Sequence, residues 1–257
     1  MTDMKTMPEV PAEGGEKMPL SYGGNGAGRT LRIAALLVLL VLVLFAILRF
    51  HMWQTPPEMK QQLALVNRWN PVSEIGYTPK LTEIEAGFQA DKQCTEAAKR
   101  MLADCRSAGC RPMILSAYRS VDDQLVLYDE EVQRLVNRGY SPELAEDEVS
   151  KKIAAPGRSE HELGLALDIV DEDFSETSDR QAQTDVSRWL KENAWRYGFI
   201  LRYPEDAEEE TGYAWHPWHY RYVGEGTAGN MHSLGITLEE YLSMFFSEEA
   251  SVVYDEN

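Results

Sequence analysis

The pattern of apolar and polar positions separates one long apolar segment from a mixed remainder. Residues 33–48 are apolar without interruption, and Arg32 and Arg49 flank them. A bilayer core needs about 20 apolar residues, within a range of about 17 to 25. We therefore expect residues 29–53 to form one transmembrane helix whose flanking arginines reach the interfaces. A signal peptide is disfavoured because no small-x-small cleavage site follows, and a buried core helix would have to be apolar all round.

The regions around this segment differ in composition, which predicts the domain boundaries. Residues 1–28 are rich in Gly, Pro, Glu and Lys and lack an apolar period, so we expect a disordered tail. Residues 54–77 carry several prolines and are expected to be a linker. A folded domain over residues 78–246 and an acidic tail over residues 247–257 complete the predicted organisation.

Basic residues beside the apolar segment predict its orientation. Lys17, Arg29 and Arg32 precede it, whereas Arg49 and Lys60 follow it. Cytoplasmic flanks carry an excess of Lys and Arg, so the slight excess on the first side places the amino terminus inside. We thus expect a single-pass protein of the cell membrane whose larger domain lies outside the cytoplasm.

The remainder of the chain mixes helical and strand patterns. Between Asp91 and Cys105, apolar residues recur at helical spacing. Ser120 with Asp123 forms a capping-box pattern at the start of another helix, and Thr237 with Glu240 caps a final helix that runs to about Phe246. Strand patterns are expected near residues 113–118, 165–170, 199–203 and 218–223. Strands interspersed with helices predict an α+β fold with a small antiparallel sheet flanked by helices.

Composition narrows the class of partner. The formal net charge is -17, which disfavours a polyanionic partner such as nucleic acid. A hydrophobic content of 44% with six Trp indicates a real core. The three cysteines show no C-x-x-C spacing, so a cysteine zinc site is not expected. Cys105 and Cys110 are either buried thiols or a pair, and the sequence leaves this open, as it does the oligomeric state.

A stretch from Ser159 to Asp168 carries the clearest chemistry. It reads S-x-H-x-x-G-x-A-x-D, with His161 on a loop and Asp168 near the far end of the strand that follows. A catalytic zinc site usually has three protein ligands, and His219 is a candidate for the third. Single histidines are usually structural, so spacing alone leaves a metal site and a structural role equally open. Of the metals, zinc suits imidazole and carboxylate ligands best.

Other polar and aromatic residues near these motifs are weaker candidates. Arg119 follows a strand and precedes a helix cap, where a guanidinium can point into a cleft or form a surface ion pair. Gln124 lies one turn into that helix and faces either the same side or solvent. Ser159 lacks the G-x-S-x-G context of a nucleophile, so a supporting hydrogen bond is the better interpretation. Tyr118 and Trp218 suit a core or a cleft wall.

Taken together, these motifs resemble those of VanY-type D-alanyl-D-alanine carboxypeptidases. The resemblance rests on Ser116–Ser120 with Gln124, on Ser159–Asp168 and on Pro217–Gly224, and it covers roughly residues 63–242. That family comprises zinc peptidases of the M15 type that are structurally related to Hedgehog amino-terminal domains. The resemblance implies the same fold for this chain. A membrane anchor is compatible with this family, whose members act outside the cytoplasm.

The resemblance also implies a role for each motif residue. His161, Asp168 and His219 would bind zinc, which activates the water that attacks the terminal peptide bond. Arg119 would polarise the carbonyl or stabilise the developing oxyanion. The residues expected to contact the substrate are Ser159, Gln124, Tyr118 and Trp218. The substrate would be a peptidoglycan stem peptide and the product free D-alanine, although a branch of the family has L,D-carboxypeptidase activity on tetrapeptides instead.

One residue departs from the family pattern. The family usually has Glu-Pro-Trp-His at the last motif, and that Glu is the general base; here the position is His216. His216 could act as the base, because a neutral imidazole accepts a proton. It could instead be a fourth ligand that closes the site, or neither, which would leave a domain that binds cell-wall peptide without hydrolysis. Carboxylates at Glu160, Glu162, Glu208, Glu209 and Glu210 are near in sequence, but their numbers place none beside the metal.

Overall fold

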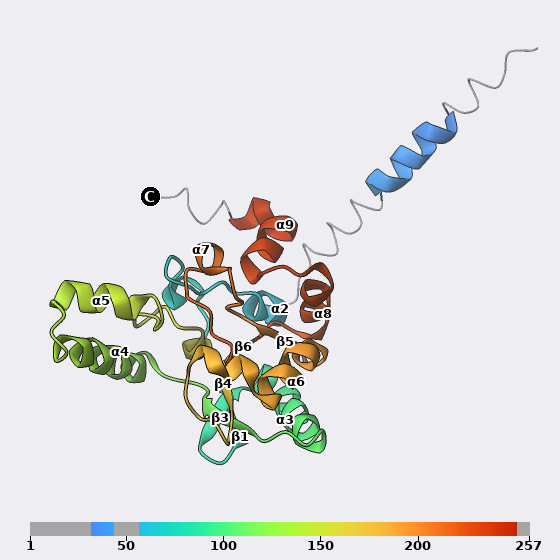
Figure 1. The fold of residues 1–257 in the computed structure, drawn as a ribbon. Helices are drawn as coiled ribbons and strands as arrows, with labels where there is room; N and C mark the ends of the chain where they lie inside the picture. Colours follow the sequence, from blue (N-terminus) through green and yellow to red (C-terminus); the bar gives the residue numbers. More distant parts are fainter. Residues whose placement is uncertain (1–31, 44–56, 251–257) are drawn as a thin grey trace, which may run out of the picture. The chain divides into compact units, whose positions relative to one another are not determined.

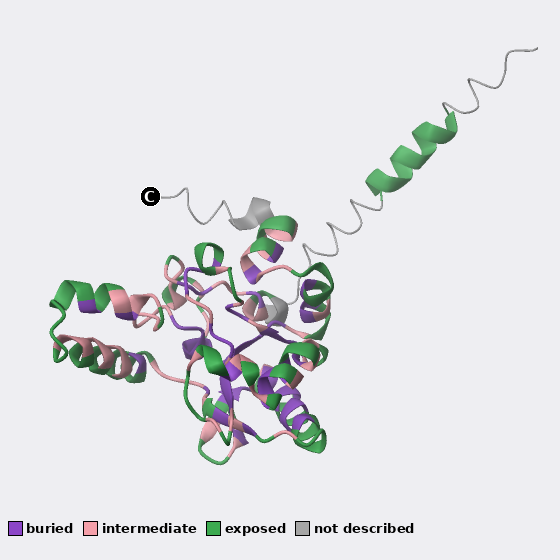
Figure 2. Ribbon diagram, in the orientation of Figure 1, coloured by how far each residue is buried: buried purple, intermediate pink, exposed green. Residues whose placement is uncertain are grey.

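The computed structural model describes residues 32–43 and 57–250, and the chain divides into a unit up to Gln54 and a second unit from Thr55 onward. In the first unit, residues 32–43 form a helix, and every residue described there is exposed (Figure 2). None of the helices that the structure describes is both long enough and apolar enough to cross a membrane.

Several predicted segments lie wholly or partly outside the described residues. The tail predicted over residues 1–28 is one of them, and most of the transmembrane helix predicted over residues 29–53 is another. Of the acidic tail predicted over residues 247–257, the structure describes the backbone of the first four residues, which continue a helix.

Among the described residues, four strands of the second unit form one antiparallel sheet, in the order β3-β4-β6-β5 (Figure 1). The strands are β3 (Pro112–Ser116), β4 (Ala166–Asp171), β5 (Phe199–Leu201) and β6 (His219–Tyr222). Each was predicted within a few residues, and together with the surrounding helices they confirm the α+β fold. A hairpin of β1 (Leu81–Glu85) and β2 (Phe88–Asp91) forms a separate small sheet that the sequence analysis did not predict.

The two central strands of the sheet, β4 and β6, have one apolar face and one polar face. Leu167 is paired with Tyr220 across β4 and β6, and both side chains belong to the main apolar cluster. Asp168 is paired with His219, and Ala166 with Arg221. Because successive side chains of a strand point to opposite faces, one face packs on the core and the other carries polar groups. The alternation seen in the sequence therefore defines both faces.

Helices α3 (Lys92–Ser107) and α6 (Asp185–Asn193) supply partners for the apolar face. The helix predicted from Asp91 to Cys105 is confirmed as α3, and the Asp91 side chain caps it by accepting a hydrogen bond from the Gln93 amide. Met101 and Leu102 of α3 and Leu190 of α6 are at most 1% exposed. They pack with the β4 and β6 side chains in one cluster, so burial of apolar area stabilises this side of the domain.

A glycine makes room between β5 and β6. Helix α6 continues into η4 (Ala194–Tyr197), which ends at Gly198 with φ of 83°. A Cβ atom at Gly198 would lie 2.7 Å from the Tyr222 ring and 2.9 Å from the Glu225 backbone nitrogen. The close approach and the left-handed conformation both require glycine.

Two helices, α4 (Val121–Val136) and α5 (Pro142–Ser150), form a hairpin that projects from the sheet (Figures 1 and 2). The capping box predicted at Ser120 and Asp123 is confirmed. Of the residues in α4, which the structure describes throughout, only Gln124 is buried. The exposed apolar residues of the hairpin include Leu125, Val126 and Leu144.

The segment predicted as a linker is in part a packed element of the domain. Residues 57–62 form α2 (Pro57–Gln62), and residues 72–74 form η1 (Val72–Glu74). Val66 is fully buried, and Arg221 donates hydrogen bonds to the carbonyl oxygens of Gln62 and Ala64. Prolines in this segment mark turns and a helix start, and the described residues 57–77 of the predicted linker include short helices and residues packed on the domain.

The carboxyl-terminal elements cover a second apolar cluster. They are α8 (Glu225–Leu234) and α9 (Leu238–Ala250), whereas α7 (Glu208–Thr211) contributes no residue to this cluster. Thr237 and Glu240 cap α9 reciprocally, as the sequence predicted. Leu238 and Val223 are fully buried in this cluster, and Leu63 is buried there with them. The start of α9 is therefore packed against the residue that follows β6 and against the segment that follows α2.

Candidate metal centre

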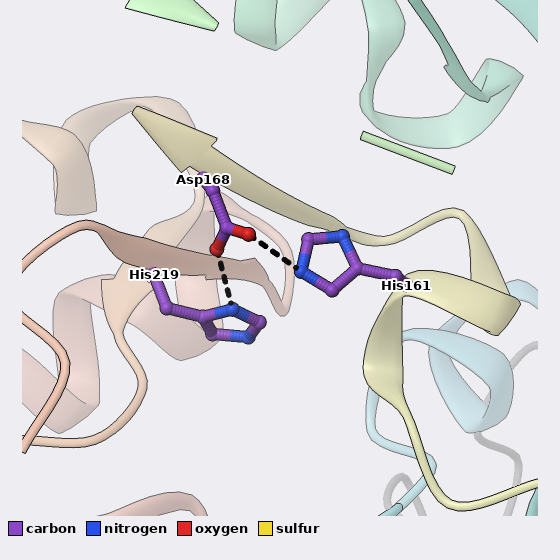
Figure 3. Close-up of side chains that lie close together, drawn as sticks. All are labelled: His161, Asp168 and His219. Atoms are coloured by element: carbon purple, nitrogen blue, oxygen red, sulfur yellow. Dashed lines mark hydrogen bonds and ion pairs between the residues drawn. The ribbon is translucent and has the colours of Figure 1, made fainter. Parts of the chain in front are cut away.

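Each of three candidate ligands comes from a different element. His161 lies in η2 (Glu160–Leu163), Asp168 in β4 and His219 at the start of β6 (Figure 3). The Ser159 hydroxyl accepts a hydrogen bond from the His161 amide at 3.3 Å and so starts η2. Gly164 ends η2 with φ of 66°, and a Cβ there would lie 3.0 Å from the Asp91 amide nitrogen. The small residue in the motif thus permits the turn into β4.

The ligand atoms of these residues converge. His161 Nε2 lies 3.2 Å from Asp168 Oδ2, and His219 Nδ1 lies 2.9 Å from Asp168 Oδ1. One ligand atom from each residue lies within 4.8 Å of the others, and all three residues are buried. The sequence predicted this grouping from two motifs about fifty residues apart, and the pairing of Asp168 with His219 in the sheet explains it.

Hydrogen bonds fix which nitrogen of each imidazole can bind a metal. His161 Nδ1 lies 2.6 Å from the Ala117 carbonyl oxygen, and His219 Nε2 lies 3.2 Å from Glu160 Oε2. A carbonyl and a carboxylate only accept, so each of these nitrogens carries the proton. His161 Nε2 and His219 Nδ1 both face Asp168, and once free of any proton shared with its carboxylate they offer lone pairs to a metal. Such outer partners are typical of metal-binding histidines, so the donor set fits zinc.

Burial and close charges shift the pKa of each of these groups. Burial, with the nearby Arg119 guanidinium, lowers the pKa of His161. Burial alone would also lower the pKa of His219, but its hydrogen bonds to Asp168 and Glu160 outweigh burial and raise it. Burial opposes ionisation of Asp168, yet the two imidazoles hold its pKa well below the usual value. Asp168 is thus an anionic ligand at neutral pH.

Behind His219 lies a buried charge network of Glu160, Arg202, Arg221 and Glu239. Glu160 Oε1 accepts hydrogen bonds from Arg202 Nε and Arg221 Nη1, each at 2.7 Å, and these side chains have no exposed surface. Burial would raise the pKa of Glu160, but Arg202, Arg221 and His219 together lower it far below the usual value. The carboxylate beside His219 is therefore charged.

This network was not predicted from the sequence. Glu160 stands inside the first motif without an assigned position, Arg221 lies inside the last motif without an assigned role, and Arg202 lies outside the motifs. A signal was present, because both arginines lie in short apolar segments that read as strands, and a buried charge requires a partner. The other acids named from the sequence differ: Glu162 accepts a hydrogen bond from the Gly157 amide, and Glu208, Glu209 and Glu210 are exposed on α7.

Arg119 is held beside Asp168. Its Nη1 lies 3.8 Å from Asp168 Oδ2 and donates to the Ser116 hydroxyl, and its Nε donates to Gln124 Oε1 at 2.9 Å. The Gln124 amide group donates at 2.7 Å to the Ala154 carbonyl oxygen, and the residue is fully buried. The structure thus brings Gln124 to Arg119, where it orients the guanidinium and has no exposed surface of its own.

His216 packs between two aromatic residues near the candidate ligands. Its ring stacks on Trp218, with centroids 4.9 Å apart, and meets Tyr203 edge to face. It makes no hydrogen bond from its ring to any described residue, and it is not among the clustered ligand atoms. Burial, together with His219, lowers the pKa of His216 to about 4. The residue is therefore a neutral imidazole at neutral pH.

The other three residues expected to contact the substrate differ in exposure and in the hydrogen bonds that they make. Ser159 is buried and its hydroxyl caps η2. Tyr118 is partly exposed, and its amide donates to the Gln89 carbonyl oxygen. Trp218 is partly exposed and its carbonyl oxygen accepts from Ile169. Tyr118 and Trp218 thus offer aromatic surface, whereas Ser159 is already engaged.

Comparison with known proteins identifies the family. The model of the family described as VanY, D-alanyl-D-alanine carboxypeptidase, matches residues 87–225. The chain belongs to the VanY family. A D-alanyl-D-alanine carboxypeptidase of Enterococcus faecalis (strain ATCC 700802 / V583) is 38% identical over 186 residues, which cover 72% of this chain and 67% of that protein. The resemblance found in the motifs is confirmed.

Solved structures agree with this assignment. VanYB in complex with D-alanine-D-alanine has a TM-score of 0.64 and 38% identity, covering 71% of this chain and 97% of that chain. A VanY variant from a VanB-type resistance cassette, solved in complex with Zn(II), has the same TM-score and identity. The match covers 71% of this chain and 99% of the variant's chain. The LdcB LD-carboxypeptidase has a TM-score of 0.62 and 33% identity, covering 72% and 87%. The chain is therefore a carboxypeptidase of a family in which a solved member binds Zn(II).

Proposed function

We propose that this VanY-family chain is a zinc-dependent D,D-carboxypeptidase that removes the terminal D-alanine from peptidoglycan stem peptides. The observation that carries the proposal is the convergence of His161 Nε2, an Asp168 carboxylate oxygen and His219 Nδ1 within 4.8 Å of one another. Each imidazole has its other nitrogen held by an acceptor, so neither ring needs to rotate to present His161 Nε2 or His219 Nδ1 to a metal.

The roles of the residues follow from their positions. A bound zinc ion supplies Lewis-acid polarisation of the scissile carbonyl and activation of water at neutral pH. Arg119 presents a cation beside Asp168, fixed by Ser116 and Gln124. A guanidinium held in advance at this place stabilises negative charge that develops on the carbonyl oxygen. Tyr118 and Trp218 provide partly exposed aromatic walls for the substrate.

His216 is the proposed proton acceptor and donor in place of the usual Glu. Its ring nitrogens are unengaged by described residues, and its low pKa keeps one lone pair available at neutral pH. A base whose pKa is near 4 is weaker than one matched to the working pH, so slow turnover is expected. A fourth-ligand role is less favoured, because the ring is not in the cluster of ligand atoms.

The test is D-alanine release by the full-length protein from a pentapeptide stem, with zinc and with a chelator. We expect chelator-sensitive release, lost on substitution of His161, Asp168 or His219 by Ala. His216→Ala should reduce the rate by about 10²- to 10⁴-fold, as for loss of a general base. A wild-type protein that binds zinc but releases nothing, with release gained in His216→Glu, would instead identify a domain that binds cell-wall peptide without cutting it.

A second candidate is L,D-carboxypeptidase activity on tetrapeptide stems. The likeness to LdcB, at 33% identity and a TM-score of 0.62, favours including it. The same assay with a tetrapeptide separates the two candidates. Release from the tetrapeptide but not from the pentapeptide would replace the D,D assignment.

We also propose that the chain is anchored to the cell membrane by one helix, with the catalytic domain outside the cytoplasm. The exposed helix at residues 32–43 supports this, because its large apolar side chains, such as Leu36 at 64% and Val41 at 64%, have no described partner. The full chain should sediment with membranes, and a chain starting near Gln54 should remain in the supernatant. A full chain that stays in solution without detergent would refute the anchor.

A further inference from the structure

Two carboxylates orient the His219 ring, one at each nitrogen. Its Nδ1 faces Asp168 at 2.9 Å, while its Nε2 faces Glu160 Oε2 at 3.2 Å. If Glu160 moves, the proton on Nε2 loses its acceptor and the ring is free to rotate or to adopt the other tautomer. Whatever fixes Glu160 therefore also fixes the nitrogen that a metal requires.

Two guanidiniums fix Glu160, and they are anchored differently. Arg221 donates to the carbonyl oxygens of Gln62 and Ala64, so the main chain holds it. Arg202 is instead held by a second carboxylate. Its Nη1 and Nη2 donate to the two oxygens of Glu239 at 2.8 and 2.6 Å, a bidentate pair. Such pairs give directional as well as electrostatic support.

The charge balance of the network depends on Glu239. Glu160 and Glu239 carry two negative charges against the two positive charges of Arg202 and Arg221, so the network is neutral. The Glu239 side chain is 10% exposed, whereas those of Arg202 and Glu160 have no exposed surface. Loss of Glu239 would leave one uncompensated positive charge buried directly behind His219. Such a charge both disfavours a dication at the centre and pulls Glu160 toward Arg202.

We propose that Glu239, in the first turn of α9, is a positioning residue of the zinc centre that acts through Arg202 and Glu160 on His219. The inference rests on the proposed zinc function and adds a determinant of metal affinity in the carboxyl-terminal helix. Asn67 Nδ2 also donates to Glu239 Oε1 at 3.2 Å, so the segment after α2 supports the same carboxylate.

The test compares zinc affinity in the full-length wild type and in Glu239→Gln, which keeps the shape of the side chain and removes its charge. Zinc is titrated in competition with a chromophoric chelator. We expect binding weakened by about 10-fold, the lower end of the effect typical of direct partners of metal ligands, because Glu239 acts through two other residues. The matched control is Glu225→Gln, which breaks the exposed Arg100–Glu225 pair and should leave the affinity unchanged.

A second readout separates positioning from a merely structural role. Co²⁺ bound to the wild type and to Glu239→Gln is compared by its visible absorption per bound ion, which reports ligand geometry and not the fraction folded. We expect a changed band shape in Glu239→Gln and none in Glu225→Gln. Arg202→Lys keeps the charge but cannot form the bidentate pair, and it should reproduce both effects if Glu239→Gln does not fold.

The outcomes are distinguishable from failure of the proposed function. A wild type that binds neither Zn²⁺ nor Co²⁺ would refute the zinc centre itself. A wild type that binds zinc, with equal affinity and an equal Co²⁺ spectrum in folded Glu239→Gln and Arg202→Lys, would refute the positioning role alone.

Discussion

The two faces of the β3-β4-β6-β5 sheet use the same strands for different purposes. On one face Leu167 and Tyr220 are almost fully buried among apolar neighbours, where contact area alone contributes to stability. On the other face Asp168 and His219 are equally paired but polar, and charged groups surround them. Neighbouring residues of a single strand therefore carry stability and chemistry separately. Substitutions at adjacent positions should separate the two.

The largest effect is expected on the polar face, from Asp168→Asn. The change keeps the volume but removes the anionic ligand, and metal catalysis is worth several kcal/mol of transition-state stabilisation. We expect D-alanine release to fall by about 10³-fold or more, with the fold retained. Activity and bound zinc are measured on the same sample, while circular dichroism checks the fold. Full activity with full zinc content would place the centre elsewhere.

One position earlier, Leu167→Ala should affect stability and not chemistry. Removal of a fully buried leucine side chain leaves a cavity and costs about 2–5 kcal/mol of the free energy of unfolding. Urea denaturation measures this loss. The zinc affinity of the folded protein should stay that of the wild type, and a strong loss of affinity would show that the two faces are not independent.

The pH dependence of stability tests the burial of His216. Its pKa is lowered from 6.5 to about 4 by burial and by His219. Between these pH values the unfolded chain binds a proton that the folded chain does not, so stability falls as the pH decreases through this window. The expected loss from this residue is about 3 kcal/mol, and it is absent above pH 6.5.

The variant His216→Gln should show a shallower decline than the wild type in urea denaturation of the metal-free protein between pH 7 and 4.5. If the free energy of unfolding falls equally with decreasing pH in the two proteins, the His216 imidazole binds protons as readily in the folded state as in the unfolded state. That result would contradict its burial.

The smallest effect is expected on the projecting α4–α5 hairpin, which belongs to neither face. Val126 is 57% exposed, and surface substitutions usually change stability by less than about 0.5 kcal/mol. Val126→Ser should leave both the urea midpoint and zinc affinity unchanged. A marked rise in KM with unchanged stability would extend the substrate-binding surface onto this helix and sharpen the contrast with the sheet.

The sequence predicted those features that depend on local pattern. Alternation around Leu167 and Asp168 gave β4 and its two faces, and side-chain caps at Ser120 and Thr237 gave two helix starts. The convergence of His161 with His219 followed from motif resemblance, because spacing alone left it open. The Glu160–Arg202 contact was not predictable in this way, since a buried ion pair depends on which elements meet in space. The packing of residues 57–77 was missed for the same reason.

The strand order has a consequence for how the domain is made. Strand β6 lies between β4 and β5 although it is synthesised after both. Until residue 222 is available, β4 and β5 each have an open edge, and unpaired edges favour association with other chains. His219 arrives with β6, and Glu239 follows it. Sheet closure and assembly of the metal ligands therefore both wait for β6, so a product truncated before this strand exposes an unpaired sheet edge and has no complete centre.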